Sequence, residues 1–300
     1  MKDLHIALAQ GHWTGAQAST QRLYRGLVAD AAATGAELIC LPEFTILPYF
    51  PGVRDRAGFR WAETIPGGAS ERFFSELARR HSVFLIGSLF ERDAAGDYWD
   101  TATLHDPSGQ LQGITRKVHI PSGAGYHETD YFAGAGQYPV HDIGALKLAA
   151  PTCYDQWFPE LARIYALEGA EFIFYPTAIG SEPTAPDFDS AAAWQLVMRG
   201  HAVANGLFIA ACNRTGRENA VTFYGSSFIC DPLGAIVAEA SRDSDQVIDA
   251  VLHADAREQY LALFPLLHQR QPQRYGRLLQ AAATEPPPRR DTQLMAGQAS

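Results

Sequence analysis

Short apolar runs and helix-spaced apolar residues alternate along the first half of the chain. The runs are rich in Ile, Leu and Val, which favours buried strands, and the stretches between them repeat apolar residues every three or four positions, which favours helices. An Asp-Pro-Ser-Gly turn predicts a hairpin between two further runs. We predict strands at residues 4–9, 37–41 and 83–89, helices at 19–34 and 70–81, and the hairpin at 97–105 and 110–116.

The second half of the chain repeats this alternation. We predict strands at residues 145–150, 171–175, 207–212, 226–230, 235–239 and 247–252, and helices at 158–169 and 190–205. Gly169 stands at the end of a helix, where a left-handed backbone is easily adopted. Repeated strand–helix–strand units with hairpins predict a layered α/β protein with mixed sheets and a single domain, not an all-parallel barrel. We expect residues 284–300, which include a proline run, to form a flexible tail.

Composition and charge narrow the class of protein. Of the 300 residues 47% are hydrophobic and 19% are charged, which is typical of a globular chain. The net charge of −9 argues against nucleic-acid binding, which needs a basic face. The apolar runs are far shorter than the ~20 residues of a membrane span, and we expect no secretory signal. Four cysteines without a paired spacing predict free thiols, and so a soluble cytoplasmic enzyme.

Cys153 is the strongest candidate for chemistry. It follows a predicted strand and precedes a predicted helix, so its thiol should lie near the amides of a helix N-terminus. Such amides favour a thiolate and can hold an oxyanion. A lone cysteine is otherwise more often a small buried apolar residue. The catalytic interpretation therefore needs a partner that can take the thiol proton.

Two charged residues follow predicted strands in the same way. Glu43 comes after the strand at 37–41, and Lys117 comes after the second strand of the hairpin. The carboxyl ends of strands are where α/β proteins bind ligands, although a charged residue there is otherwise a solvated edge. A carboxylate near an ammonium and a thiol can take the thiol proton, pass it to leaving ammonia and then activate water. His201 and Asn205 share a helix face, but nothing marks them as partners of the thiol.

Three sequence blocks carry a family resemblance. Leu41-Pro-Glu43, the run from Arg116 to Pro121 and the run from Cys153 to Glu160 resemble, in order, the three catalytic blocks of the nitrilase (carbon–nitrogen hydrolase) superfamily. The resemblance covers nearly the whole chain. Within the superfamily the sequence is most similar to the N-carbamoylputrescine amidohydrolases, notably at Gly125-Tyr-His-Glu128 and from Phe174 to Pro183.

The resemblance implies an α-β-β-α sandwich over residues 1–283 that hydrolyses amides through an acyl-enzyme. It implies that Cys153 is the nucleophile, Glu43 the general base and Lys117 the cation that stabilises the tetrahedral intermediate, with Glu128 as a second glutamate nearby. It also implies a homodimer or a larger homo-oligomer. No cofactor is implied, and we expect no metal because the histidines and cysteines lack metal-ligand spacings.

N-carbamoylputrescine, hydrolysed to putrescine, CO₂ and ammonia, is the substrate that the resemblance favours. A substrate that ends in an ammonium needs a carboxylate at the far end of its pocket. Glu182 is our first candidate and Asp187 or Asp189 could also provide it, unless these residues are solvated loop acids. Tyr49, Tyr126 and Trp157 are candidate pocket aromatics, although any one such residue is more often part of the core. Glu160 either positions the catalytic loops or is an acid that the helix dipole stabilises on a first turn.

Several alternatives stay open at this point. The activity could instead be that of a nitrilase, an N-carbamoyl amino acid amidase or an ω-amidase, or the fold could be a scaffold without activity. An arginine such as Arg199 or Arg214 in the pocket would favour acid substrates. The sequence also departs from the family at Asp100, where the resemblance leads us to expect Asn.

Overall fold

The apolar runs of the first half, joined by the last strand, form one six-stranded sheet. The computed structural model describes residues 1–283, so the predicted tail lies outside the described residues. The strand order is β14-β1-β2-β3-β4-β5, and the first three strands along the chain are parallel. The strands are β1 (Leu4–Gln10), β2 (Leu38–Cys40), β3 (Phe84–Arg92), β4 (Tyr98–His105), β5 (Leu111–Arg116) and β14 (Gln246–Leu252).

The second half forms another six-stranded sheet in the order β13-β12-β9-β8-β7-β6. Three of its inner strands, β7 to β9, are parallel, and the remaining strands pair antiparallel with their neighbours. The strands are β6 (His141–Asp142), β7 (Lys147–Ala149), β8 (Phe172–Pro176), β9 (Phe208–Cys212), β12 (Phe228–Cys230) and β13 (Ile236–Glu239). A separate hairpin consists of β10 (Thr215–Glu218) and β11 (Val221–Tyr224).

The two sheets pack face to face, because alternate residues of each strand point to opposite faces. In β1, Ile6 and Leu8 belong to the apolar core between the sheets, together with Phe172 and Phe174 of β8. The residue between them in β1, Ala7, belongs to a second core under the outer helices. Both faces of each sheet are therefore covered, which explains why the strands are so uniformly apolar.

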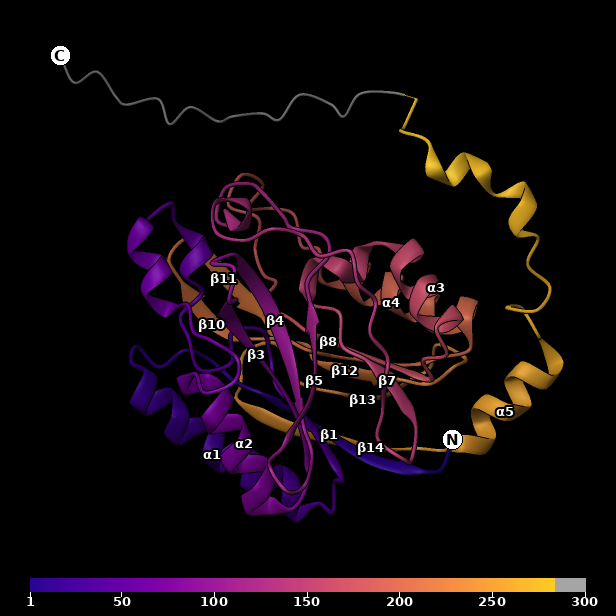
Figure 1. Ribbon diagram of the computed structural model, residues 1–300, viewed down its shortest axis with the longest axis horizontal. Coiled ribbons are helices and arrows are strands. Elements are labelled where there is room, and N and C mark those ends of the chain that lie inside the picture. Colours follow the sequence, from indigo (N-terminus) through magenta and orange to yellow (C-terminus); the bar gives the residue numbers. More distant parts are fainter. Residues whose placement is uncertain (284–300) are drawn as a thin grey trace.

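Helices cover the outer face of each sheet, and Figure 1 shows the resulting four layers. The helices α1 (Gln17–Ala33) and α2 (Ala69–His81) pack on the first sheet, and α3 (Pro159–Leu167) and α4 (Ala191–Asn205) pack on the second. Gly169 follows α3 with a φ of +94°, as its position after the helix predicts. The predicted α-β-β-α sandwich is confirmed.

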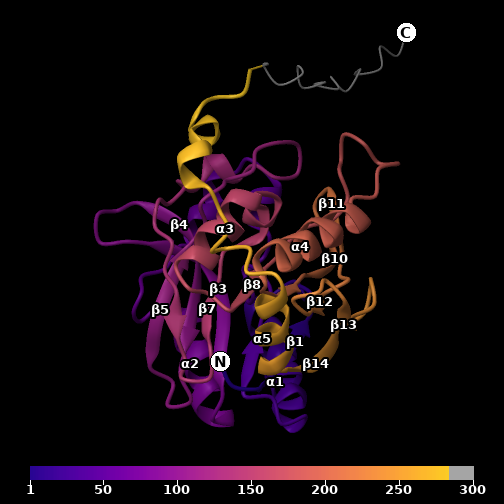
Figure 2. The ribbon, with the colours of Figure 1, turned by 90° about the vertical axis from the view of Figure 1, so that its right-hand side faces the viewer.

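The structure also contains elements that the sequence pattern did not predict. The hairpin of β10 and β11 is short and polar on its outer side, and α5 (Ala254–Leu263) buries only Tyr260, so neither has a strong apolar period. The strand expected at 226–230 begins at Phe228, because Ser226 has a left-handed backbone with φ of +56°. Figure 2 shows the segment after α5, in yellow, leaving the edge of the sandwich.

The topology brings the ends of three strands to one place. β5 runs in the same direction as β2, because β2 and β3 are parallel and the next two pairs are antiparallel. The loop with Glu43 and the loop with Lys117 therefore leave the same edge of the first sheet. Cys153 follows β7 of the facing sheet. Among residues 1–283 no helix is both long enough and apolar enough to cross a bilayer.

Candidate active site

The ammonium of Lys117 lies at the centre of the site. Its Nζ is 2.7 Å from Oε1 of Glu43, 2.5 Å from Oε2 of Glu128 and 3.3 Å from Oδ2 of Asp100. All four side chains are completely shielded from solvent. The structure thus brings together three of the predicted site residues and adds Asp100, whose place in the site the sequence analysis missed.

The backbone around these groups is held by specific bonds. The amide of Lys117 donates to the carbonyl of Asp100 at 2.9 Å, which fixes the first residue after β5 against β4. The buried guanidinium of Arg214 donates to the carbonyls of Glu43 and Phe44, each at 3.1 Å. Phe44 has a φ of +47°, an unfavourable value for an aromatic residue. Arg214 therefore holds the loop of Glu43 in a conformation that the loop alone would not prefer.

Cys153 begins a 3₁₀ turn, Cys153–Trp157, that leads into α3. Its φ of +44° is a strained value for a residue with a side chain and is typical of functional sites. The expectation that this turn stabilises a thiolate is wrong for the resting site. Burial raises the pKa of the Cys153 thiol well above its usual range, as does the charge of Glu43, and these effects outweigh Lys117 and the amide of Ala178.

The charges of the cluster shift one another. Burial tends to lower the pKa of Lys117, but Glu128, Glu43 and Asp100 reverse the effect and hold that pKa well above its usual value. Burial raises the pKa of Glu43 well above the usual range even though Lys117 opposes it, and the pKa of Glu128 is raised for the same reason. The result is a permanent ammonium beside carboxyl groups that hold protons readily.

Asp155 connects the loop that follows Lys117 to the turn that begins at Cys153. Its carboxylate accepts from the backbone amides of Val118 at 3.1 Å and His119 at 2.8 Å, and also from the amide of Thr152 at 3.2 Å. The ring Nδ1 of His119 lies 2.8 Å from the same carboxylate. Asp155 was not among the predicted site residues, although its position two residues after the nucleophile candidate was a usable signal.

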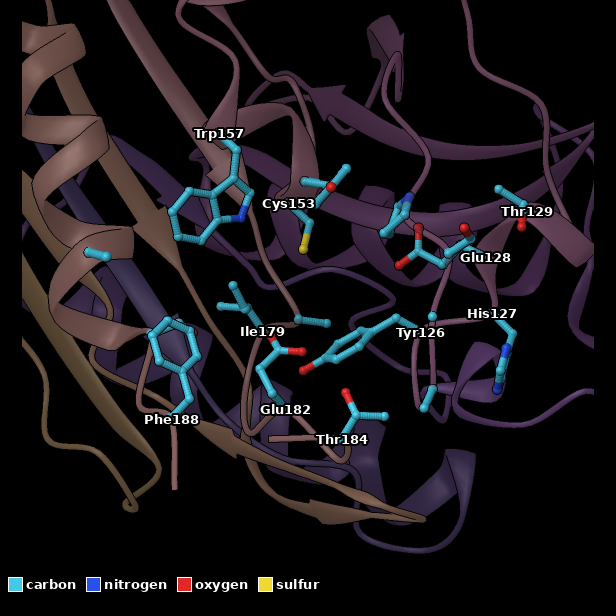
Figure 3. A pocket seen from close by; sticks show the side chains of 18 of the residues that line it. Tyr126, His127, Glu128, Thr129, Cys153, Trp157, Ile179, Glu182, Thr184 and Phe188 are labelled. Atoms are coloured by element: carbon cyan, nitrogen blue, oxygen red, sulfur yellow. The ribbon is translucent and has the colours of Figure 1, made fainter. Parts of the chain in front are cut away.

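A cavity of about 1160 Å³ opens over the cluster. Cys153, Glu128, Tyr126, Trp157 and Glu182 all line it. Figure 3 shows the sulfur of Cys153 pointing into this cavity, with Trp157 on one side of it and Glu128 on the other. Three of the four residues predicted to bind substrate therefore lie in the cavity wall.

Glu182 faces the cavity with a carboxylate that has no ion pair or side-chain hydrogen bond among residues 1–283. It is half-buried, and burial raises its pKa above the usual value. The hydroxyl of Tyr126 points toward it in Figure 3 and is held by the amide of Gly180 at 3.1 Å. Glu182 is thus a negative group without a neutralising partner on the wall of the cavity.

Two predicted site residues lie elsewhere. Tyr49 is completely buried behind the cavity wall, where its hydroxyl donates to Oε1 of Glu128 at 2.8 Å, so its placement as a substrate contact was wrong. Glu160 is exposed on the first turn of α3. The groups that hold the ammonium of Lys117 are the three carboxylates, and the first-turn interpretation of Glu160 fits its position.

The three carboxylates also have the spacing of a metal site. One oxygen of each of Glu43, Asp100 and Glu128 lies within 4.8 Å of the others. Hard cations favour such oxygen ligands. The ammonium of Lys117, however, already lies within 2.5–3.3 Å of all three groups. The cluster is therefore better suited to hold its own lysine than a divalent ion.

The fold and this site define a hydrolase that acts on C–N amide bonds. The sequence profile named Carbon-nitrogen hydrolase matches residues 5–260, and the chain belongs to that family. A citrullinase from Francisella tularensis subsp. tularensis is 37% identical over 93% of this chain and 99% of its own length. An N-carbamoylputrescine amidase from Arabidopsis thaliana is 37% identical over 84% of this chain and 87% of its own length.

Solved structures agree with this assignment. The crystal structure of a carbon–nitrogen hydrolase from Helicobacter pylori G27 superposes with a TM-score of 0.86 at 32% sequence identity. The match covers 93% of this chain and 99% of that one. The resemblance to the nitrilase superfamily that the sequence blocks predicted is confirmed.

Proposed function

We propose that this protein hydrolyses the ureido group of N-carbamoylputrescine to give putrescine, CO₂ and ammonia. The observation that carries the proposal is Glu182, an unpaired carboxylate in the same cavity as the thiol of Cys153. A substrate with an ammonium at one end and a carbamoyl group at the other would place its charge on Glu182 and its reacting carbon at the sulfur. The aromatic rings of Trp157 and Tyr126 provide apolar walls for the methylene chain between them.

The first half of the reaction forms the acyl-enzyme. The Cys153 sulfur attacks the carbamoyl carbon while Glu43 takes the thiol proton, so that no free thiolate is needed. Burial raises the pKa of Glu43, so its carboxylate binds a proton more tightly than an exposed glutamate would, while the ammonium of Lys117 at 2.7 Å favours the ionised form that can act as the base. Lys117 stabilises the oxyanion, which by comparison with single oxyanion donors is worth about 3 kcal/mol. Glu43 then protonates the nitrogen, and ammonia leaves.

The second half hydrolyses the thiocarbamate. Water attacks the same carbon, Glu43 takes a proton from the water, and the C–S bond breaks with return of a proton to the sulfur. The product is a carbamic acid, which separates into the amine and CO₂. Glu128 accepts from Tyr49 and from Lys117, so we assign it the role of holding the ammonium in place.

Citrulline is the second candidate substrate. Its ureido group and amine are joined by the same chain of carbons as in N-carbamoylputrescine, and it carries in addition a carboxylate beside the amine. Neither Arg199 nor Arg214 lines the cavity, because each is bound to backbone carbonyls. Arg54 does line it, although it is paired with Asp130 at 3.2 Å. The similarity to a citrullinase and the presence of Arg54 favour citrulline as the alternative.

Ammonia release from a matched panel of substrates tests the proposal. The panel contains N-carbamoylputrescine, citrulline, N-carbamoylbutylamine (which lacks the ammonium), an ω-amide and a nitrile. We expect the highest kcat/KM for N-carbamoylputrescine, a large loss for N-carbamoylbutylamine and no turnover by Cys153→Ala. A higher kcat/KM for citrulline would make citrulline the assigned substrate. Equal rates with and without the ammonium, or turnover of nitriles alone, would overturn the proposal.

A further inference from the structure

The cluster around Lys117 contains more negative groups than positive ones. Among residues 1–283, Lys117 is the only cation that forms an ion pair with Glu43, Asp100 or Glu128. If all three acids were ionised, a net charge of minus two would be completely buried. Burying unpaired charge is costly, and the usual response of a protein is to retain a proton. At least one carboxyl of the cluster therefore has reason to be protonated.

Two oxygen atoms mark where that proton resides. Oε2 of Glu43 and Oδ2 of Asp100 are both buried and accept no hydrogen bond among the described residues, although Oδ2 lies 3.3 Å from Nζ of Lys117 as an ion-pair contact. The other oxygen of each carboxyl does accept a hydrogen bond: Oε1 of Glu43 accepts from Lys117 at 2.7 Å, and Oδ1 of Asp100 accepts from the hydroxyl of Ser88 at 3.3 Å. A buried acceptor without a donor costs about 1–3 kcal/mol. A single proton between the two carboxyls would satisfy both oxygens and remove one negative charge.

We propose that Glu43 and Asp100 share one proton in the resting site, so that Asp100 is a positioning residue for the general base. Asp100 then acts as the donor that holds Glu43 ionised and oriented, and the remaining lone pairs of Glu43 can receive the thiol proton. The inference rests on the proposed role of Glu43 as the base. Because the two carboxyls interact closely, each loss of a proton is a property of the pair and not of either residue alone.

The proton count of the reaction balances with this pair. The pair holds one proton at rest and two after the thiol of Cys153 has given up its proton. It returns to one proton when ammonia leaves, and the same cycle repeats when water attacks. No oxidant, reductant or further co-reactant is needed, because the pair only stores and returns a proton.

The shared proton makes the site sensitive to alkali. The titratable groups that face Asp100 are Glu43 after β2, Lys117 after β5 and Glu128 in the turn Glu128–Asp130, and β3 contributes only the hydroxyl of Ser88. If the pair loses its proton, a second negative charge appears beside the thiol. That charge opposes the deprotonation of the thiol, and it also opposes the formation of the negatively charged oxyanion. Activity should therefore fall on the alkaline side by about tenfold per pH unit.

The variant Asp100→Asn tests the proposal. An amide supplies a permanent donor of the same shape, so we expect reduced but measurable activity and a pH profile without the alkaline fall. Ser88→Ala is the matched control, because it removes a contact to Asp100 without changing the number of ionisable groups, and its profile should fall as the wild type does. If the activity of Asp100→Asn still falls at alkaline pH, the inference is overturned. It is also overturned if Ser88→Ala loses the alkaline fall as Asp100→Asn does. A folded Asp100→Asn protein that is inactive at every pH would overturn it as well.

Infrared spectroscopy gives a second test that needs no turnover. The wild-type protein near neutral pH should show the band of a protonated carboxylic acid that Asp100→Asn and Glu43→Gln each lack. Glu63→Gln is the control, because it removes a different buried acid whose pKa is also raised by burial. If Asp100→Asn does not fold, Glu43→Gln alone decides. Identical spectra for wild type and Glu43→Gln would overturn the shared proton, whatever the substrate is.

Discussion

In the proposed mechanism, Cys153 has to lose its proton in surroundings that oppose the loss. Its thiol is buried, and the charges of Glu43 and Glu128 raise its pKa further. A thiol of this kind is inert until a base takes its proton during the attack on a bound substrate. At the scale of single residues, the site therefore limits reactivity to molecules that reach the cavity and place a carbonyl beside Lys117.

Glu182 gives a residue-scale prediction about substrate charge. Glu182→Gln removes one partner of a charged hydrogen bond, which is worth about 1.5–3 kcal/mol. We expect KM for N-carbamoylputrescine to rise by roughly 10- to 100-fold with kcat little changed. Steady-state kinetics with N-carbamoylbutylamine provide the control, because a substrate without the ammonium should not respond. An equal rise in KM for both compounds would remove Glu182 from the ammonium site.

The same residue predicts a dependence on pH. Burial raises the pKa of Glu182 above its usual value, so the carboxylate takes up a proton at a higher pH than an exposed glutamate would. The protonated form cannot pair with an ammonium. We expect KM for N-carbamoylputrescine to increase as the pH falls through this raised pKa, and we expect Glu182→Gln to lack that increase. A KM that is independent of pH in the wild type would contradict the assignment.

At the scale of elements, Asp155 joins two parts of the site that come from different sheets. It accepts from the amides of Val118 and His119, which follow β5, and from Thr152, which precedes the cysteine turn. We expect Asp155→Asn to lower the free energy of unfolding by about 2 kcal/mol and kcat by more than tenfold. Urea unfolding and kinetics measure the two effects. The exposed Asp243→Asn should change neither, and wild-type activity in Asp155→Asn would show that the connection is unimportant.

His201 on helix α4 predicts that the folded protein loses stability in acid. Burial lowers the pKa of His201 from 6.5 to about 4. The folded protein keeps this ring neutral while the unfolded chain takes up a proton, so stability is lost as the pH falls from about 6.5 toward 4. The loss attributable to this ring is about 3 kcal/mol. We expect His201→Gln to show a smaller decrease in unfolding free energy over this window, whereas the exposed His253→Gln should follow the wild type.

The sequence pattern predicted most elements but not all of the site. Strands with apolar residues on both faces and helices such as α2, with Phe73, Phe74 and Leu77 on one side, have periods that are visible in the sequence. The hairpin of β10 and β11 lacks such a period. Asp100 and Tyr49 could not be placed because their roles arise from contacts between distant strands and loops, which local patterns do not encode.

At the scale of the whole molecule, the C-terminal segment exposes apolar side chains. Leu263, Phe264, Leu278 and Leu279 are all exposed, between 52% and 92%, and Figure 2 shows the segment leaving the sandwich. Extended exposed apolar surface is typical of an interface. The homo-oligomer that the family resemblance implies stays a prediction, and this segment is our candidate for its interface. Replacing Leu278 and Leu279 with Ser should lower the molar mass in sedimentation, and an unchanged mass would exclude the segment from the interface.

The two halves of the sandwich bring the thiol of Cys153, the ammonium of Lys117 and the carboxylate of Glu43 to one place, and the proposed mechanism predicts covalent chemistry on Cys153. Mass spectrometry of the protein quenched during turnover of N-carbamoylputrescine tests it directly. We predict that the peptide containing Cys153 gains the mass of the substrate minus ammonia, and that Cys153→Ala neither gains this mass nor releases ammonia. An unmodified Cys153 during rapid turnover, together with ammonia release by Cys153→Ala, would contradict the mechanism.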